Sequence, residues 1–407
     1  MAKKRRPIGD VPAESIGRFH VALIIESSRG YGRGVLWGIT RWVRTHGPWS
    51  ISWQDRGLAE PVPPWLKAWK GHGVIVRVNS PAMIQAVLDK GVPAVNLRGD
   101  RDWPLPLVET DEKAVSRFAF EHLAERGFRH FAYCGFAGVV YSQRRLEAFT
   151  QFVSQAGHQC HAYSGQWRDG RGSQKYREGH GLLYEEDLIK WVRSLPRPVG
   201  IMACSDLRGQ QLLNACRESG VAVPDEVAVI GVDNDRLLCE LSDPPLSSVE
   251  PDTPRIGFEA AALLDRLMRG GPAPEAPLFL QPKGVVIRQS TDVLAIEDHD
   301  VALAVRFIRE NACRGIAVED VMRRVPLTQA VLKGRFEKYL GHSPKAEIVR
   351  CRLARVKQLL AETDLSLEAI ARQTGFEHPE YLSALFKQKT GQTPGQFRTV
   401  GQLGGWP

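Results

Sequence analysis

Five polar residues share a position just beyond an apolar stretch of the chain, and their chemistry suits the binding of hydroxyl groups. They are Tyr31, Arg33, Ser205, Asp206 and Asp233. Carboxylate, guanidinium and hydroxyl side chains supply the donors and acceptors that the hydroxyls of a sugar need once they leave water. Any one of these residues could instead cap a loop or carry a surface charge. Their common position favours a shared binding site.

A second group of polar and basic residues lies near the C-terminus. Its members are Thr328, Gln329, Lys333, Arg335, Lys338, His378, Glu380, Ser383 and Lys387. Lysine and arginine neutralise phosphate charge, whereas glutamine and glutamate can bond the edges of adenine and cytosine. We therefore predict that this group contacts DNA. The residues expected to contact bases are Gln329, Lys333, His378 and Glu380, and those expected to contact phosphates are Arg335, Lys338 and Lys387.

Two helical units of similar design must hold this second group. They occupy 318–341 and 367–391, and each has the pattern of a short amphipathic helix, a tight break and a second helix. The apolar spacing of four is carried by Leu332, Phe336, Leu340, Leu382 and Phe386. Thr328 suits a helix N-cap, and Pro379 suits a first helical position. One such hairpin could belong to an ordinary bundle, but two around an amphipathic helix at 345–362 favour paired helix-turn-helix units.

The motif GFEHPEYLSALFKQKTGQTPGQFR, at 375–398, resembles the end of the DNA-binding domain of AraC-type transcription regulators. The resemblance covers roughly the last hundred residues. It implies two recognition helices in successive major grooves, joined by a long helix. The chain departs from the family pattern at Pro326, where glycine is usual, at Gly334, inside the first recognition helix, and at the small Ala384. Gly334 should cost its helix about 1 kcal/mol relative to alanine.

The part of the chain from residue 19 to about 290 alternates apolar and helical stretches. Predicted strands lie at 19–25, 73–76, 93–97, 131–134, 199–204 and 227–232, with helical patterns between them. Repeated strand–helix units predict parallel sheets with helices on both faces. The chain has more strand–helix units than one open sheet holds. We therefore expect two lobes, with a ligand crevice at the strand ends.

Three motifs in this part resemble the effector-binding domain of lactose-repressor-type regulators, a two-lobed relative of periplasmic sugar-binding proteins. They are ETDEKAVSRFAFEHLAERGFRHFAYCG at 109–135, YSQRRLEAF at 141–149 and VPDEVAVIGVDND at 223–235. The resemblance implies that Arg145 and Asp233 are the strongest effector contacts. It also implies a contact pair at Ser205 and Asp206, whereas Tyr31 and Arg33 match by position only.

That family carries an N-terminal helix-turn-helix, which this chain replaces with the C-terminal AraC-type module. The domain order is similar to that of bacterial xylose-operon activators. The predicted fold class is an α/β two-lobed periplasmic-binding-protein-like domain followed by an all-α domain with two helix-turn-helix units. The predicted parts are a basic flexible arm at 1–18, the effector domain at 19–290, a linker at 291–302, the DNA-binding domain at 303–400 and a tail at 401–407.

Charge and composition agree with a nucleic-acid partner. The chain has 407 residues and a net charge of +8, and residues 303–400 alone contain 17 Lys and Arg against 10 Asp and Glu. A basic end module on a nearly neutral body favours attraction to phosphate.

Other chemistries lack the residues they need. The seven cysteines form no CxxC pair, and the glycines of RGYGRG, at 29–34, lack the GxGxxG spacing of a dinucleotide site. We predict no metal and no cofactor. The charged N-terminus MAKKRRPIGD has no apolar core, and no apolar run reaches membrane-spanning length, so we expect a cytoplasmic protein with no membrane partner.

These observations predict a sugar-responsive DNA-binding transcription regulator, an activator of genes for xylose or a related sugar. The expected partners are promoter DNA, a small sugar with xylose as first candidate, RNA polymerase and a second copy of the chain. The same architecture could respond to another sugar or to a non-sugar effector. The rivals are a sugar-binding protein that never touches DNA and an enzyme with Asp206 and Asp233 as acid and base. The tandem helical units and the missing Ser-His-Asp arrangement argue against them.

Overall fold

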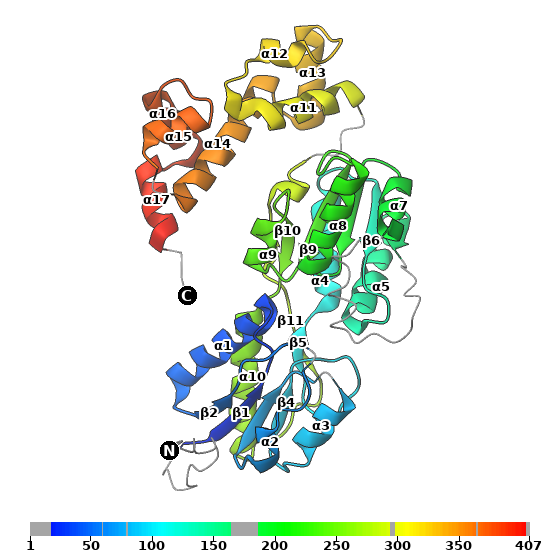
Figure 1. Cartoon of the computed structure of the whole chain (residues 1–407), viewed down its shortest axis with the longest axis vertical. Helices are drawn as coiled ribbons and strands as arrows, with labels where there is room; N and C mark the ends of the chain where they lie inside the picture. The colour runs from blue at the N-terminus through cyan, green and yellow to red at the C-terminus, as the bar shows by residue number, and fades with distance from the viewer. Residues whose placement is uncertain are drawn as a thin grey trace, which may run out of the picture. The chain divides into compact units, whose positions relative to one another are not determined.

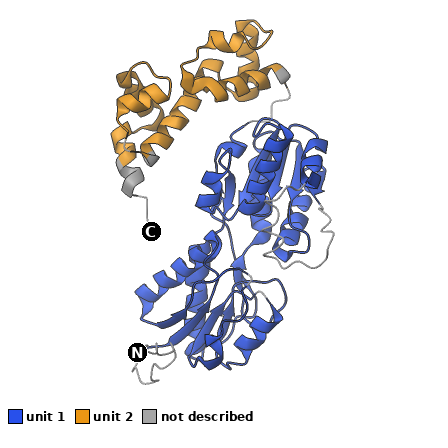
Figure 2. Cartoon of the chain, in the orientation of Figure 1, with its two compact units in different colours: residues 1–293 blue, residues 294–407 orange. Residues whose placement is uncertain are grey.

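The structure is a computed structural model that describes residues 18–58, 60–78, 80–163, 186–293, 298–363 and 365–403. The chain forms two compact units, Met1–Val293 and Leu294–Pro407 (Figure 2). The predicted arm at 1–18 lies outside the described residues except for Arg18, and so do residues 404–407 of the predicted tail.

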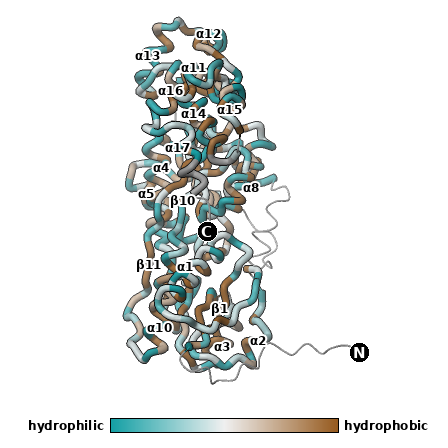
Figure 3. The backbone as a smooth tube through the Cα atoms, turned by 90° about the vertical axis from the view of Figure 1, so that its left-hand side faces the viewer, coloured by the Kyte–Doolittle hydropathy of each residue, from teal (hydrophilic) through white to brown (hydrophobic). Residues whose placement is uncertain are grey.

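The first lobe of unit 1 is a parallel sheet between two layers of helices. Its strands, in the spatial order β2-β1-β3-β4, are β1 (His20–Ile24), β2 (Ser50–Trp53), β3 (Gly73–Val76) and β4 (Ala94–Asn96). Its helices are α1 (Gly30–His46), α2 (Trp65–Ala68), α3 (Pro81–Leu88) and α10 (Thr253–Met268). Helices α1 and α10 cover one face of the sheet, and α2 and α3 cover the other (Figure 1). Strand β1 is apolar over most of its length (Figure 3), and the helices on both sides bury it.

Glycines in α1 allow it to pack closely against the start of α10. A Cβ at Gly34 would lie 2.0 Å from Oγ1 of Thr253, and one at Gly38 would lie 1.9 Å from the carbonyl oxygen of Pro254. Since neither distance is possible for a side chain, the two helices can approach this closely only at glycine. The glycine-rich start of α1 thus serves helix packing.

The second lobe is a six-stranded sheet. Its spatial order is β12-β10-β9-β8-β6-β7, and only β12 runs antiparallel to its neighbour. The strands are β6 (His130–Cys134), β7 (Cys160–Tyr163), β8 (Val199–Ala203), β9 (Val227–Val232), β10 (Ser247–Glu250) and β12 (Gly284–Val286). The helices are α4 (Glu112–Ala124), α5 (Val140–Gln155), α7 (Glu186–Ser194), α8 (Asp206–Ser219) and α9 (Arg236–Leu241), with a 3-10 turn, η1, at Gln289–Thr291. Strands β8 and β9 are buried along their whole length, as parallel strands covered on both faces must be.

Three crossings join the lobes. They follow β5 (Val108–Thr110), β10 and β11 (Leu278–Leu280), and β5 and β11 pair in parallel between the two larger sheets (Figure 1). The crossing after β10 returns the chain to the first lobe at α10. The predicted two-lobed α/β fold is confirmed, and the polar residues at the strand ends lie where the lobes meet.

Unit 2 is entirely helical among its described residues. Its elements are α11 (His299–Asn311), η2 (Ala312–Arg314), α12 (Val318–Met322), α13 (Gln329–Leu340), α14 (Pro344–Glu362), α15 (Leu367–Gln373), α16 (Pro379–Thr390) and α17 (Pro394–Leu403). One apolar core gathers α11, α12 and α13, a second gathers α15 and α16, and α14 contributes to both (Figure 1). The predicted pair of helix-turn-helix units around a long helix is confirmed.

The region predicted as a linker, 291–302, is partly structured. Thr291 belongs to η1 and is fully buried within unit 1. Asp298 accepts a hydrogen bond from the amide of Val301 at 3.2 Å, and this cap starts α11 at His299. Residues 299–302 therefore form the first turn of a helix, because Asp298 satisfies an amide that a helix start leaves unpaired.

Candidate effector site and DNA-binding surface

A strained loop follows β9 at the point where the lobes meet. Asp233 has φ +107° and Asn234 has φ +48°, values that residues other than glycine seldom adopt. Asp206 holds this loop, since one of its carboxylate oxygens accepts from the amide of Asp235 at 2.7 Å and the other accepts from the Ser248 hydroxyl at 2.6 Å. Backbone strain of this kind persists only where surrounding contacts enforce it, and it often marks a functional loop.

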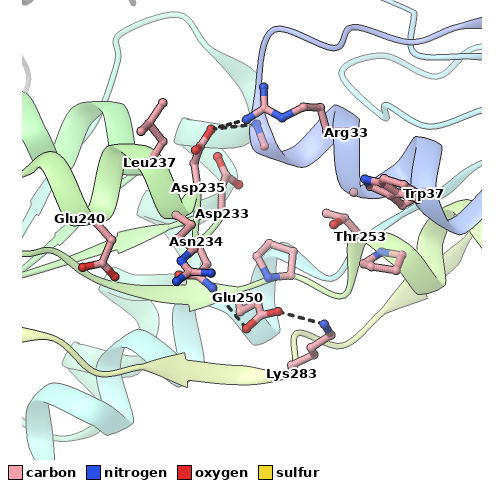
Figure 4. A pocket seen from close by; sticks show the side chains of 15 residues that line it. Arg33, Trp37, Asp233, Asn234, Asp235, Leu237, Glu240, Glu250, Thr253 and Lys283 are labelled. Atoms are coloured by element: carbon pink, nitrogen blue, oxygen red, sulfur yellow. Dashed lines mark hydrogen bonds and ion pairs between the residues drawn. The ribbon is translucent and has the colours of Figure 1, made fainter. Parts of the chain in front are cut away.

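The loop lines a cavity of about 590 Å³ at the junction of the lobes (Figure 4). Arg33 and Trp37 reach the cavity from α1 in the first lobe, and Asp233 and Asn234 reach it from the second. The crossing after β10 supplies Glu250, Pro251, Thr253 and Pro254, and Lys283 lies beside them. This volume falls within the range of small-molecule sites.

Asp235 connects the two lobes directly. Its carboxylate accepts a hydrogen bond at 2.8 Å from the amide of Gly30, the first residue of α1, and lies 3.4 Å from Nη2 of Arg33 (Figure 4). A carboxylate is favoured at this position because the start of a helix offers unpaired amides and a partial positive charge. The contact holds loop 233–235 against the first lobe.

A buried polar cluster adjoins Asp233 on the side of the first lobe. Arg77, directly after β3, forms an ion pair with Glu26, and its guanidinium carbon lies 4.6 Å from the ring centre of Tyr31. The Tyr31 hydroxyl is 3.0 Å from Oγ1 of Thr110. Each of these polar groups is therefore held in place by a neighbour before any ligand arrives.

Arg145 is the counterpart of Arg77 in the second lobe. Its Nε and Nη2 donate to the two carboxylate oxygens of Glu112, at 2.5 and 3.1 Å, and its Nη1 donates to the carbonyl oxygen of Cys204. These bonds use three of the five guanidinium N–H groups and fix the plane of the side chain. The second lobe thus holds the Arg145 guanidinium, a hydrogen-bond donor, in a fixed orientation.

Asp233 lies in the electrostatic field of both lobes. Burial raises the pKa of its carboxyl to about 6, while Arg145 from the second lobe and Arg77 from the first act to lower it. Burial also raises the pKa of Glu109, on β5, to about 7, and the nearby Glu112 carboxylate adds to that rise. Two carboxyl groups at the lobe junction therefore titrate near neutral pH, as is common at binding sites.

The six residues predicted as effector contacts divide into three groups. Arg33 and Asp233 line the cavity, and Tyr31 and Arg145 lie in the buried polar environment of Asp233. Ser205 and Asp206 have structural bonds instead: Ser205 caps α8 by accepting from the amide of Arg208 at 3.4 Å, and the two oxygens of Asp206 accept from the loop and from Ser248 on β10. We therefore assign Asp206 to loop positioning, because a side chain 1% exposed with two internal partners has little to offer a ligand.

The junction residues outside the predicted contacts include Arg77, Trp37 and Asp235. Arg77 follows a strand, so the rule that identified Asp233 could have found it. Asp235 stands two residues after Asp233 in the same motif. Trp37 carries no such signal, since its place at the cavity depends on how α1 crosses α10.

Helices α13 and α16 form the candidate DNA-binding surface. Their inward residues Leu332, Phe336, Leu382 and Phe386 are fully buried. On the outside, the exposed predicted contacts are Thr328, Gln329, Lys333, Lys338, His378, Glu380 and Lys387, and Ser383 is half-buried. Thr328 caps α13 by accepting from the amide of Val331 at 3.4 Å, and Pro379 is the first residue of α16. Gly341 and Gly391 end the two helices with φ of +72° and +77°, so the same design occurs twice at a spacing of fifty residues.

Arg335 differs from the other predicted contacts. Its Nη1 donates to Asp298 at 3.0 Å and lies 3.4 Å from a carboxylate oxygen of Asp300. These carboxylates belong to the start of α11 and neutralise the guanidinium. The structure thus gives Arg335 a bond between α13 and α11, and its phosphate contact stays a prediction from sequence.

The two parts of the chain match known domain families. Residues 120–291 match the model of a periplasmic binding protein-like domain, and residues 321–399 match that of a helix-turn-helix domain. A solved structure of a dimeric lac repressor covers 67% of this chain and 98% of its own, at 17% identity and a TM-score of 0.50, and so shares the fold of unit 1. A ligand-binding fold joined to paired helix-turn-helix units defines a DNA-binding transcription regulator with an effector domain.

The chain also matches known proteins along nearly its whole length. It is 30% identical over 392 residues to the xylose operon regulatory protein of Escherichia coli K12, covering 94% of this chain and 97% of that protein. A solved structure described as a xylose-binding transcription activator, xylR, covers 95% of this chain and 99% of its own, with 29% identity and a TM-score of 0.75. The chain belongs to the family of xylose operon regulatory proteins. The resemblances found in the sequence are thereby confirmed.

None of the described helices is both long enough and apolar enough to cross a membrane.

Proposed function

We propose that the chain binds xylose or a closely related pentose at the lobe junction and, in response, activates genes for its use from promoter DNA. The observation that carries the proposal is the position of Asp233. Its loop lines the cavity between the lobes, and its carboxyl is influenced by Arg77 from one lobe and Arg145 from the other. A hydroxyl-rich ligand would satisfy these charged groups through hydrogen bonds that both lobes share.

Ligand binding would act by favouring one arrangement of the lobes. Asp233 and Asn234 would bond sugar hydroxyls, Arg33 would donate from α1, and the flat face of Trp37 would cover the apolar side of the sugar ring. A sugar can shift the balance between arrangements only through its different affinity for each of them. Contacts from both lobes to one ligand provide that difference, because they form together only when the lobes are close.

The partners follow from this mechanism. Promoter DNA would be held by α13 and α16, with the exposed Gln329, Lys333, His378 and Glu380 at bases and Lys338 and Lys387 at phosphates. A homodimer is supported by the dimeric lac repressor that shares the fold of unit 1. Activation in the cytoplasm would further require contact with RNA polymerase.

The test is the thermal midpoint of the full chain against xylose, other pentoses, hexoses and a disaccharide. A ligand that binds the folded form raises the midpoint in a concentration-dependent manner. We expect a rise with xylose that Asp233→Asn abolishes. The matched control is Asp187→Asn, at an exposed carboxylate of α7, which should keep the rise.

Three outcomes would change the proposal. A rise with a different sugar, lost in Asp233→Asn, would keep the site and replace the effector. If xylose raises the thermal midpoint of Asp233→Asn as much as that of the wild type, Asp233 does not belong to the sugar site. Turnover of the added sugar would support the enzymatic rival instead.

A further inference from the structure

Gly334 stands in the middle of α13 with nothing packed against it. A Cβ built on this residue meets no heavy atom within 4 Å outside the local helix backbone. Glycines inside α1 and α10 are explained by close neighbours: a Cβ at Gly32 would lie 1.9 Å from the carbonyl oxygen of Glu26, and one at Gly257 would lie 2.0 Å from that of Val35. The packing that accounts for those glycines is missing around Gly334.

Glycine is an unfavourable choice for this position in the isolated chain. It is second only to proline in opposing a helix interior, since its backbone loses the most freedom on folding. Residue 334 is the sixth of twelve in α13 and lies far from both caps. Neither a turn nor a tight contact among the described residues requires glycine here, so the fold of the described chain does not account for it, and a partner that meets this side of the helix would.

The position of Gly334 on the helix indicates which partner. Leu332 and Phe336, each two residues away, are fully buried. Two residues correspond to about 200° around a helix, so Gly334 lies at the centre of the outward side. Lys333 and Lys338, both exposed, flank it. A basic, outward helix side in a helix-turn-helix unit is the side that enters a DNA major groove.

We propose that Gly334 is a positioning residue for DNA, where the missing side chain lets the backbone of α13 approach the floor of the major groove. Glycine is the usual residue where a backbone comes close to a ligand. The corresponding position of α16, fifty residues on, carries the exposed Ala384, which lies two residues from both Leu382 and Phe386. Closer approach brings the neighbouring Gln329 and Lys333 within reach of base edges. The inference rests on the assignment of unit 2 to DNA.

The test compares Gly334→Ala and Gly334→Leu with the wild-type full chain. The probe is a duplex that the wild-type chain enriches from a random pool. Both variants favour the helix, so we expect the thermal midpoint of unit 2 to rise, by about 4 °C for alanine. Despite this, affinity for the selected duplex should fall roughly tenfold for alanine and further for leucine, because the displaced helix loses base contacts. The slope of affinity against salt should stay the same, since no charge changes.

Gly395→Ala is the matched control. Gly395 lies in α17 of the same unit, and a Cβ there also meets no heavy atom within 4 Å. This variant should keep the affinity for the selected duplex. The proposal is overturned if Gly334→Ala and Gly334→Leu bind the duplex as tightly as the wild type, or if the loss of affinity comes with a lower thermal midpoint. Weak, salt-insensitive binding by the wild type itself would instead count against the assignment of unit 2 to DNA.

Discussion

The two units use polar side chains in opposite ways. At the lobe junction of unit 1 they are buried and already paired, as Arg145 is with Glu112 and Arg77 is with Glu26. On α13 and α16 of unit 2 most of them are exposed, and Lys333 pairs with Glu337 at 3.8 Å on the same helix. The difference reflects the size of the ligand that each surface is built to hold.

A small ligand must be enclosed, and enclosure removes water from every group around it. Charged groups then need partners within the protein, or their loss of hydration would destabilise the fold. A DNA duplex cannot be enclosed, and its phosphates attract groups that remain in water until binding. Substitutions should therefore change folding stability in unit 1 and DNA binding in unit 2, and the following predictions test this contrast.

Arg145→Ala should have the largest effect. The side chains of Arg145 and Glu112 are only 4% and 12% exposed. Removing one partner leaves a buried charge uncompensated, which costs about 3–5 kcal/mol. We expect the free energy of unfolding of unit 1 to fall by that amount in urea denaturation of the full chain. Lys190→Ala, which removes a surface pair with Glu186, should change it by less than about 0.5 kcal/mol. Equal effects of the two variants would contradict the contrast.

Glu109→Gln should change how stability depends on pH. The pKa of this carboxyl is raised from 4.5 to about 7, so the folded chain holds the proton more tightly than the unfolded chain does. The stability that the protonated carboxyl contributes is therefore lost as the pH rises from about 4.5 through 7. Glutamine cannot ionise. Between about pH 5 and pH 8, the free energy of unfolding of the variant should therefore exceed that of the wild type by roughly 1–3 kcal/mol.

Thermal midpoints across this pH range would measure that gain. Glu186→Gln, at a carboxylate whose side chain is 82% exposed, is the control and should follow the wild type. If the midpoints of Glu109→Gln and the wild type stay parallel at every pH, Glu109 does not titrate in this window.

Arg335→Ala tests the exception within unit 2. Its guanidinium is bound by Asp298 and Asp300, with its side chain 39% exposed. Loss of this partly exposed contact should lower the stability of unit 2 by about 1 kcal/mol or less. The salt slope of DNA binding should not change. A shallower slope with unchanged stability would restore Arg335 to the phosphate contacts predicted from sequence.

Lys387→Ala should have the smallest effect on folding. This lysine is exposed near the end of α16, and its loss should change stability by less than about 0.5 kcal/mol. The slope of log affinity against log salt should fall by about 0.9, as one phosphate contact disappears. Titrations at several salt concentrations, with Lys190→Ala as the control in unit 1, would measure it. A slope equal to that of the wild type would remove Lys387 from the surface that meets DNA.

Much of this organisation was predictable because the signals are local. Leu332 and Phe336 share a helix face by spacing alone, and Thr328 and Pro379 mark helix starts through the chemistry of their own backbone neighbours. The strand-end position of Asp233 likewise needs only a few residues of context. The partners of Arg335 could not be predicted in this way, since Asp298 and Asp300 stand more than thirty residues away.

By itself, the sequence determined the class of this protein: two lobes of strand and helix, two helix-turn-helix units, and the residue types predicted to meet sugar and DNA. Periodicity and capping act over a few residues, and so they are legible in the chain. Only the tertiary structure decided which polar groups remain available. It pairs the two oxygens of Asp206 with the loop and with β10, bonds Asp235 to the start of α1, and places Trp37 at the cavity. The physical reason is that partners and burial are set by contacts between segments far apart in sequence.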